Sequence, residues 1–234
     1  HNEIKAQNSQ VDHQQIQQLI QETYNLYRND STGKNADYIP YLANVPSNLF
    51  GISVITRDGK IFSVGATDYE FGIESISKVF VLAQAMEIVG PDFSETNIGV
   101  GATGMPFNSV IAIELEGQKP VSPIVNGGAM ATNSLIKGTS KEDQFAKILA
   151  YMSKWANRPL RVIEELYQSE AATNEHNKAI AMLLASYGHM WSDPLVACDS
   201  YTRQCSIGIN TKELAKLAGV LANEGKQPVT KEQL

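Results

Sequence analysis

The stretch FGIESISKVF, residues 71–80, carries the most informative pattern in this chain of 234 residues. Ser75 and Lys78 are three positions apart, so on a helix their side chains share one face. A serine becomes a nucleophile when a neighbouring base takes its proton, and a lysine whose pKa is lowered by desolvation can be that base. The spacing therefore points to acyl transfer on a serine hydroxyl.

The same spacing occurs three times, at Ser31-Lys34, Ser75-Lys78 and Ser134-Lys137. The first pair lies in a polar run, residues 29–35, that is typical of a solvated loop. The third runs directly into Gly138, a stop signal for a helix. Only the Ser75 pair follows a clear hairpin pattern and opens an apolar helical pattern, so its context favours it.

The hairpin is predicted from residues 49–55 and 60–64, which have strand composition and are joined by Asp58-Gly59, a tight-turn signal. A helix is expected to begin after Phe71-Gly72 and to end at Gly90-Pro91. Its buried stripe is predicted to be Ile76, Val79, Phe80 and Ala83. Ser75 then lies at the helix N-terminus, where free N–H groups and the dipole favour developing negative charge.

Four further helices and a loop follow from pattern and capping signals. We expect a first helix of about 16 residues after a capping box at residues 9–12. Residues 99–128 are expected to form an ordered loop, with a turn at Asn126–Gly128. Helices are predicted after Ser140 (with Asp143), over residues 170–186 and from Asn210 (with Glu213), the last ending at 225–228.

Composition narrows the function classes. Hydrophobic residues make up 43% and charged residues 19%, which suits a folded enzyme of one large or two small domains. The net charge of −6 without a dense basic run argues against nucleic acid as a partner. No membrane-length apolar stretch and no signal-peptide core are present, which favours a cytoplasmic protein without a membrane partner.

The cysteine and histidine residues suggest neither a disulfide bridge nor a metal site. Cys198 and Cys205 are expected to be reduced, partly buried thiols rather than a disulfide. The four histidines have no metal-ligand spacing, so we expect no metal site. His176 could serve as a base, but a surface histidine on a helix is the favoured interpretation.

The end of the chain suggests a longer domain. Residues 230–233 form a new capping-box pattern, and the sequence ends one residue later. A two-stranded hairpin by itself also has only marginal stability and needs further strands to form a sheet. We expect residues 1–36 to form an N-terminal helix and loop and 37–234 a catalytic domain truncated at its C-terminus.

Residues 71–80 closely resemble the nucleophile segment of the serine-dependent glutaminase family. Further segments resemble that family in the same order: PFNS at 106–109, PIVNGGAM at 123–130, SE at 169–170, NKAIA at 177–181 and YTRQCS at 201–206. The resemblance runs from about Tyr38 to Leu234. Several motifs in one order are far more specific than one S-x-x-K spacing.

The resemblance implies an α/β (α+β) fold of the β-lactamase/DD-peptidase-like type, a helical domain plus a sheet of which only the first hairpin lies in this chain. It implies hydrolysis of L-glutamine to L-glutamate and ammonia without metal or organic cofactor, in a homodimer or homotetramer. Two family residues, a later tyrosine and a later oxyanion-hole valine, would fall beyond Leu234.

Carried over by position, Ser75 is the nucleophile and Lys78 the group that activates it. Asn126, Glu170, Asn177 and Tyr201 join Ser75 in binding the substrate. Glu170 suits the α-ammonium group, and the three neutral donors suit the α-carboxylate. Glu170 and Asn177, seven residues apart, are expected on one helix face about 10 Å apart.

Two other functions compete with this one. A penicillin-binding or β-lactamase-type hydrolase shares the S-x-x-K spacing but needs S-D-N-like and K-T-G-like elements, and Lys137-Gly138-Thr139 has the wrong order. A non-catalytic amino-acid-binding domain on the same scaffold could lose the Ser-Lys pair, but both residues are present.

Overall fold

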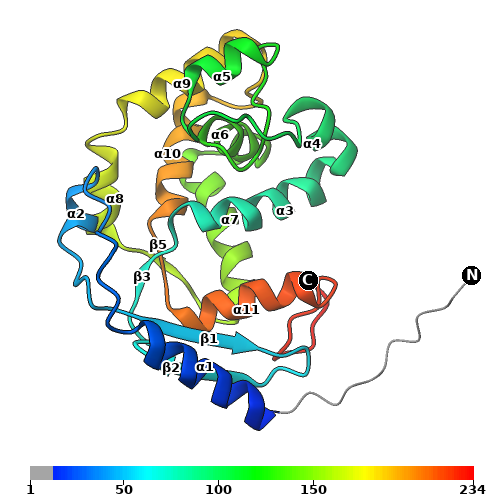
Figure 1. Ribbon diagram of the computed structural model, residues 1–234. Coiled ribbons are helices and arrows are strands. Elements are labelled where there is room, and N and C mark those ends of the chain that lie inside the picture. The colour runs from blue at the N-terminus through cyan, green and yellow to red at the C-terminus, as the bar shows by residue number, and fades with distance from the viewer. Residues whose placement is uncertain (1–12) are drawn as a thin grey trace, which may run out of the picture.

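The computed structural model describes residues 13–234 and shows a helical part beside two small antiparallel sheets (Figure 1). The first sheet is the predicted hairpin, β1 (Gly51–Ile55) and β2 (Ile61–Gly65). Helix α1 (His13–Tyr27) and helix α11 (Thr211–Ala222) pack against this hairpin. The first helix is confirmed, while its expected capping box at residues 9–12 lies outside the described residues.

The hairpin turn requires its glycine for two reasons. Gly59 has a φ of +89°, which side-chain-bearing residues rarely adopt. A Cβ at this position would also lie 2.4 Å from the carbonyl oxygen of Pro228. The Asp58-Gly59 signal therefore fixes both the turn and the approach of the C-terminal segment.

A second sheet corrects the prediction that only the first hairpin lies in this chain. Strands β3 (Phe71–Gly72), β5 (Ile207–Ile209) and β4 (Arg161–Val162) pair antiparallel in the order β3-β5-β4. Strands of two or three residues are too short to leave an alternating pattern in the sequence. Strand β3 leads into a 3₁₀ turn, η1 (Glu74–Ile76), and then into helix α3 (Ser77–Val89).

Helix α3 ends at Gly90 as predicted, but Pro91 also starts helix α4 (Pro91–Asn97). Its predicted buried stripe is half wrong, because Ile76 and Val79 are 48% and 38% exposed, whereas Phe80 is buried and Ala83 is partly buried against the core. The buried face instead combines Phe80 with the following residues: Ser77, Lys78, Val81, Gln84 and Ala85. Polar side chains are buried on this face because the elements packed against it supply their hydrogen-bond partners. A pattern of apolar residues in the sequence does not reveal such partners.

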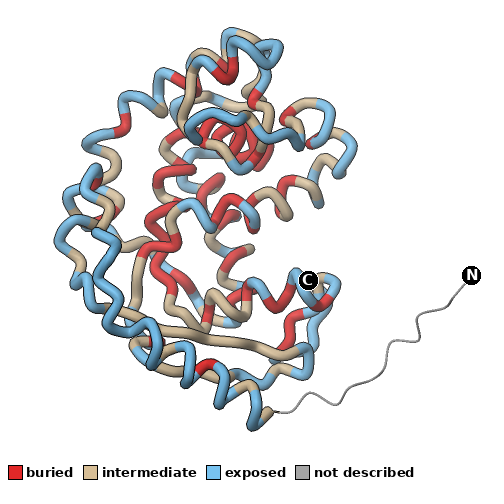
Figure 2. Tube along the Cα trace, in the orientation of Figure 1, coloured by how far each residue is buried: buried red, intermediate tan, exposed pale blue. Residues whose placement is uncertain are grey.

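The expected loop over residues 99–128 contains helix α5 (Val110–Leu115) and ends where helix α6 (Asn126–Leu135) begins. All ten residues of α6 are buried, and the helix lies at the centre of the helical part (Figure 2). The expected turn at Asn126–Gly128 is thus the first turn of α6. A Cβ on Gly128 would lie 1.7 Å from the carbonyl oxygen of Ser122, so only glycine permits this packing.

The remaining helices agree with the sequence in part. Ser140 accepts a hydrogen bond from the Asp143 amide and starts α7 (Lys141–Ala156), as predicted. The predicted helix 170–186 is two helices, α8 (Glu164–Ala171) and α9 (Glu175–Ser186). Helices α2 (Pro40–Ala43) and α10 (Pro194–Cys205) are not among the elements predicted from the sequence.

The break between α8 and α9 has a physical cause. The buried Asn174 donates through Nδ2 to Thr202 Oγ1 at 2.7 Å, so its side chain ties the chain to α10. Asparagine also competes with helical hydrogen bonding through its own side chain. The helical pattern therefore restarts after Asn174 rather than running through it.

The C-terminal region keeps one prediction and corrects another. Asn210 and Glu213 form the predicted reciprocal capping box of α11. Residues 230–233 do not begin a helix; a β-bridge pairs Lys226 with Gln233 instead.

Cys198 and Cys205 are buried free thiols, as expected. Over residues 13–234, no helix has both the length and the apolar character needed to cross a membrane.

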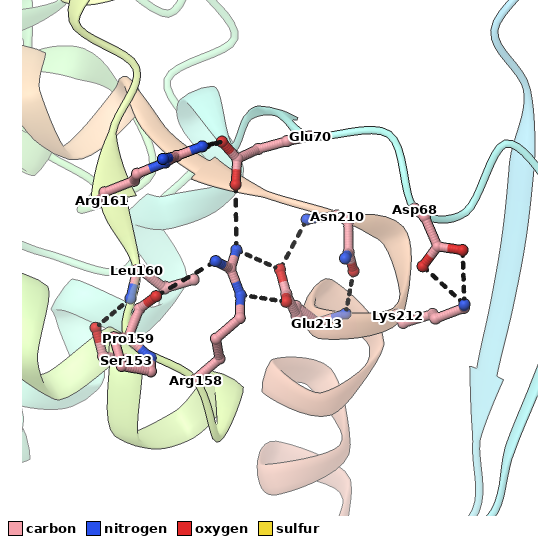
Figure 3. Close-up of polar contacts among 10 residues, drawn as sticks. All are labelled: Asp68, Glu70, Ser153, Arg158, Pro159, Leu160, Arg161, Asn210, Lys212 and Glu213. Carbon is pink, nitrogen blue, oxygen red and sulfur yellow. Dashed lines mark hydrogen bonds and ion pairs between the residues drawn. The ribbon is translucent and has the colours of Figure 1, made fainter.

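An ion-pair network ties the small sheet to α11 (Figure 3). Arg158 contacts Glu213 through Nε and Nη2, and its Nη2 lies 3.3 Å from Glu70 Oε2. Arg161, at the start of β4, also pairs with Glu70, at 3.1 Å. Because Glu70 precedes β3, the network holds β3, β4 and α11 together. Strand β3 leads directly into the turn that carries Ser75.

Replacing Arg158 should weaken the fold, because the Glu213 side chain is only 7% exposed and would lose its cationic partner. For Arg158→Ala we expect a loss of about 2 kcal/mol in the free energy of unfolding, measured by urea denaturation. Arg161→Ala, at a 77% exposed side chain, is the control and should cost less than about 1 kcal/mol. Equal losses in the two variants would contradict the assigned importance of the buried pair.

Candidate functional site

Lys78 lies in the first turn of α3 with its side chain in the interior. The residue is 3% exposed, and its Nζ donates to Asn126 Oδ1 at 2.8 Å. The rings of Tyr201 and Phe107 lie 5.6 and 5.9 Å from Nζ. Burial lowers the pKa of Lys78, and the nearby Cys205 partly offsets that effect. A neutral amine that can accept a proton is therefore more accessible here than on a surface lysine.

Ser75 lies in the 3₁₀ turn one helical turn before Lys78, and it is exposed. A buried polar chain holds this turn: Gln204 Nε2 donates to Ser77 Oγ at 2.8 Å, and Ser77 Oγ donates to the Glu74 carbonyl at 2.6 Å. Asn133 of α6 donates to Gln204 in turn, at 2.8 Å. The serine is thus presented to solvent from a turn whose other side is anchored in the core.

The two other S-x-x-K pairs lie in unsuitable places. Ser31 and Lys34 are exposed, and Lys34 pairs with Asp37 at 2.7 Å. Ser134 is buried in α6, where its hydroxyl is used by the Ala131 carbonyl and the Trp191 amide, while Lys137 is exposed. Of the three pairs, only Ser75-Lys78 combines an exposed hydroxyl with a buried amine.

Asn126 connects three other residues predicted for the site. Its Oδ1 accepts from Lys78 Nζ and, at 3.0 Å, from the hydroxyl of Tyr201. Its Nδ2 donates to Asn177 Oδ1 at 3.0 Å, and Asn177 is held by Asn174 at 2.8 Å. Burial raises the pKa of Tyr201 well above its ordinary value, Cys205 adds to the rise, and a hydrogen bond with Ser75 counteracts it.

A cavity of about 340 Å³ opens beside this cluster. Asn126, Glu170 and Asn177 line it, so the structure brings three of the predicted substrate-binding residues to one space. The other lining residues are Tyr38, Ile39, Phe107, Asn108, Thr173, Asn174 and His176. The volume lies at the small end of ligand pockets, which suits a molecule the size of an amino acid.

Glu170 and Asn177 do not share a helix face, which corrects the sequence-based expectation. Glu170 lies near the end of α8 and Asn177 in the first turn of α9. Their side chains meet the cavity from two sides of the break around Asn174, rather than from one continuous helix. The relative position of the two groups is therefore set by the connection between the helices.

Several lining residues were not identified from the sequence. Tyr38 lines the cavity although it lies in none of the motifs that carry the resemblance. Phe107 and Asn108 lie in the PFNS segment that carried part of the resemblance, so that motif was the available signal. His176, exposed on α9, contacts the Asn108 carbonyl oxygen through Nε2 at 2.7 Å. It supports the cavity wall and is not placed beside Ser75 by any contact of the described residues.

Glu74, Glu170 and Cys205 form an unusual group behind the cavity. Each offers a possible ligand atom, and these atoms lie within 4.8 Å of one another. Burial is the main cause that raises the pKa of all three, which favours their protonated forms. That the chain needs no metal stays a prediction.

Comparison with known proteins agrees with the geometry. The pattern of the family described as "Glutaminase" matches residues 33–234. The chain is 48% identical to a glutaminase of Desulfovibrio desulfuricans over 221 residues, which are 94% of this chain and 71% of that protein. Glutaminase 1 of Escherichia coli strain K12 is 48% identical over 220 residues, with the same coverage of 94% and 71%.

Solved structures give the same result. A structure named "Probable glutaminase ybaS" superimposes with a TM-score of 0.93 at 47% identity, covering 96% of this chain and 72% of that one. Mglu in its glutamate form superimposes with a TM-score of 0.85 at 29% identity, covering 93% of this chain and 50% of that one. With the match over residues 33–234, the chain belongs to the glutaminase family, the amidohydrolases that act on glutamine.

Proposed function

We propose that this chain hydrolyses L-glutamine to L-glutamate and ammonia through an acyl-enzyme on Ser75. Family membership supports the reaction over a β-lactam hydrolase or a non-catalytic binding domain. The observation that carries the mechanism is the pairing of an exposed Ser75 with a buried Lys78 of lowered pKa in the next turn. Asn126 holds the lysine amine in place.

The reaction has two steps. Ser75 Oγ attacks the side-chain amide carbon while Lys78 accepts the hydroxyl proton, and the amide nitrogen leaves as ammonia after taking up a proton. Water then attacks the glutamyl ester, gives its proton to the base, and releases glutamate and the free serine. The N-terminal end of α3 favours the negative charge that develops on the tetrahedral intermediates.

The cavity supplies the groups that a free amino acid needs. Glu170 is the anion for the α-ammonium group, and Asn126 and Asn177, which also line the cavity, are neutral donors for the α-carboxylate. Tyr201 is the third proposed donor; it is not a lining residue of the cavity and adjoins it through its hydrogen bond to Asn126. The likeness to Mglu in its glutamate form supports this assignment, because glutamate is the product of the proposed reaction. Tyr38, Phe107 and His176 complete the wall.

Finer features of the assembly are also part of the proposal. A nucleophile at the start of a helix between a helical part and antiparallel strands supports a β-lactamase-like arrangement. We further propose a catalytic domain over residues 37–234, a cytoplasmic location and a homodimer or homotetramer. Light scattering on the purified protein distinguishes these assemblies from a monomer.

Removing the Ser75 hydroxyl should abolish turnover while leaving glutamine binding measurable, because the cavity side chains remain. For Ser75→Ala we expect ammonia release to fall by at least about 10³-fold, as with other serine nucleophiles. Ser31→Ala removes the serine of the exposed S-x-x-K match and should leave kcat unchanged. Turnover by Ser75→Ala within tenfold of the wild type would rule out the assigned nucleophile.

The state of Lys78 should govern the pH dependence of kcat. The base must be neutral, so kcat at saturating glutamine should rise with pH through the lowered pKa of Lys78 and level off above it. Lys78→Arg keeps a charge that is not lost at ordinary pH and should lose nearly all activity. Lys137→Arg, at the exposed match, is the control. An active Lys78→Arg enzyme with an unchanged pH profile would contradict the role of the lysine.

Glu170→Gln should weaken binding more than chemistry, because it removes the charge that attracts the ammonium group. We expect KM to rise by about 30-fold, the scale of one charge-assisted hydrogen bond, with a smaller change in kcat. Glu165→Gln, exposed on the same helix, should leave KM unchanged. An unaltered KM in Glu170→Gln would show that Glu170 does not hold the ammonium group.

A further inference from the structure

Glu74 lies directly before the nucleophile and carries a carboxyl group that the proposed reaction does not use. Its backbone has a φ of +52°, the left-handed region that residues with a side chain rarely adopt. The neighbouring Gly72 has no side chain, and a Cβ there would lie 3.2 Å from Glu74 Oε1. An uncommon backbone conformation thus directs this carboxyl group inward, behind the cavity rather than to solvent.

The partner of Glu74 is another carboxyl group, that of Glu170. Oxygens of the two lie within 4.8 Å of one another and of Cys205 Sγ. The Oε1 atoms of both residues are buried, and neither has a hydrogen-bond partner among residues 13–234. Two ionised carboxylates this close repel one another, and burial without a donor adds to the cost, so a state with one proton on the pair is favoured.

The surroundings do not supply a compensating cation. Within residues 13–234, neither carboxyl group has a Lys or Arg ion-pair partner. The groups that face the pair are Tyr38 before α2 and Tyr201 and Cys205 on α10. The Lys78 amine on α3 lies near Cys205 and is held by Asn126. Burial raises the pKa of Tyr38, Tyr201 and Cys205, so these three are neutral near pH 8.

We propose that Glu74 and Glu170 share one proton in the free enzyme and release it when the α-ammonium group of glutamine binds at Glu170. The proposal rests on the proposed function and makes Glu74 a positioning residue, because it acts on the substrate through Glu170. The proton leaves the pair for solvent, and the ammonium group takes its place as the positive charge that the two carboxylates share. The buried acid pair thereby becomes a receptor for a cation.

Thermodynamic linkage between proton release and glutamine binding determines whether glutamine affinity rises or falls with pH. A bound ammonium stabilises the ionised pair, so binding lowers the pKa of the pair and glutamine affinity must rise with pH. Burial raises the pKa of Glu74 to about 7, and burial together with the Glu74 charge raises that of Glu170 to about 9. These values belong to the pair as a unit, so pH 7–9 is the window in which proton release should appear.

The test uses Ser75→Ala, which binds glutamine without consuming it. Titration calorimetry at pH 8 in two buffers of different ionisation enthalpy measures the protons released on binding. We expect about one proton per glutamine, and a gain in affinity of about tenfold per pH unit between pH 7 and 8. Glu74→Gln in the same background keeps the shape and a donor to Glu170 but removes the second ionisable carboxyl group, so it should release fewer protons than its parent and show a shallower rise of affinity with pH. Glu165→Gln is the matched control and should behave as its parent.

The possible outcomes separate this inference from the proposed function. If Ser75→Ala binds glutamine without releasing a proton, or if Glu74→Gln releases as many as its parent, the shared proton is wrong while the hydrolase assignment stands. If Ser75→Ala fails to bind glutamine, or still turns it over, the proposed function fails instead. The parent variant alone decides the first question, so the inference stays testable even if Glu74→Gln does not fold.

Discussion

Two donors converge on a single amide oxygen, Oδ1 of Asn126, and the site depends on this convergence. Lys78 and Tyr201 come from α3 and α10, and both helices pack against α6, whose first residue accepts from the two side chains. An amide oxygen suits this role because it accepts two hydrogen bonds without carrying a charge. A carboxylate in its place would hold the lysine as a cation and remove its capacity to accept a proton.

The position of Asn126 follows in turn from the packing of α6. A helix buried along its whole length satisfies its polar side chains against its own backbone or against its neighbours, and Asn133 reaches Gln204 and the turn that carries Ser75. Gly128 lets the preceding loop close over the same helix. A shift of α6 would therefore move both the core of the helical part and the turn that carries Ser75.

Elements with a strong local signal could be predicted from the sequence: the Asp58-Gly59 hairpin, the cap at Ser140 and the capping box at Asn210 and Glu213. The second sheet could not, because its strands are held by pairing between segments far apart in the chain. The site residues were named through motif order, whereas the roles of Tyr38 and Glu74 depend on distances that no local pattern encodes. The one-helix placement of Glu170 and Asn177 failed because Asn174 bonds to Thr202.

That interruption has a consequence for how the cavity can change over evolution or by design. With Glu170 on α8 and Asn177 on α9, the two groups proposed to hold the ends of an amino-acid backbone are joined by a short connection. An insertion or deletion there would alter their separation, and it would also reach Asn126, because Asn177 hydrogen-bonds to Asn126 and α9 packs against α6. Recognition of the amino-acid head group and the position of Lys78 are thus coupled through Asn126, so the length of one connection affects both.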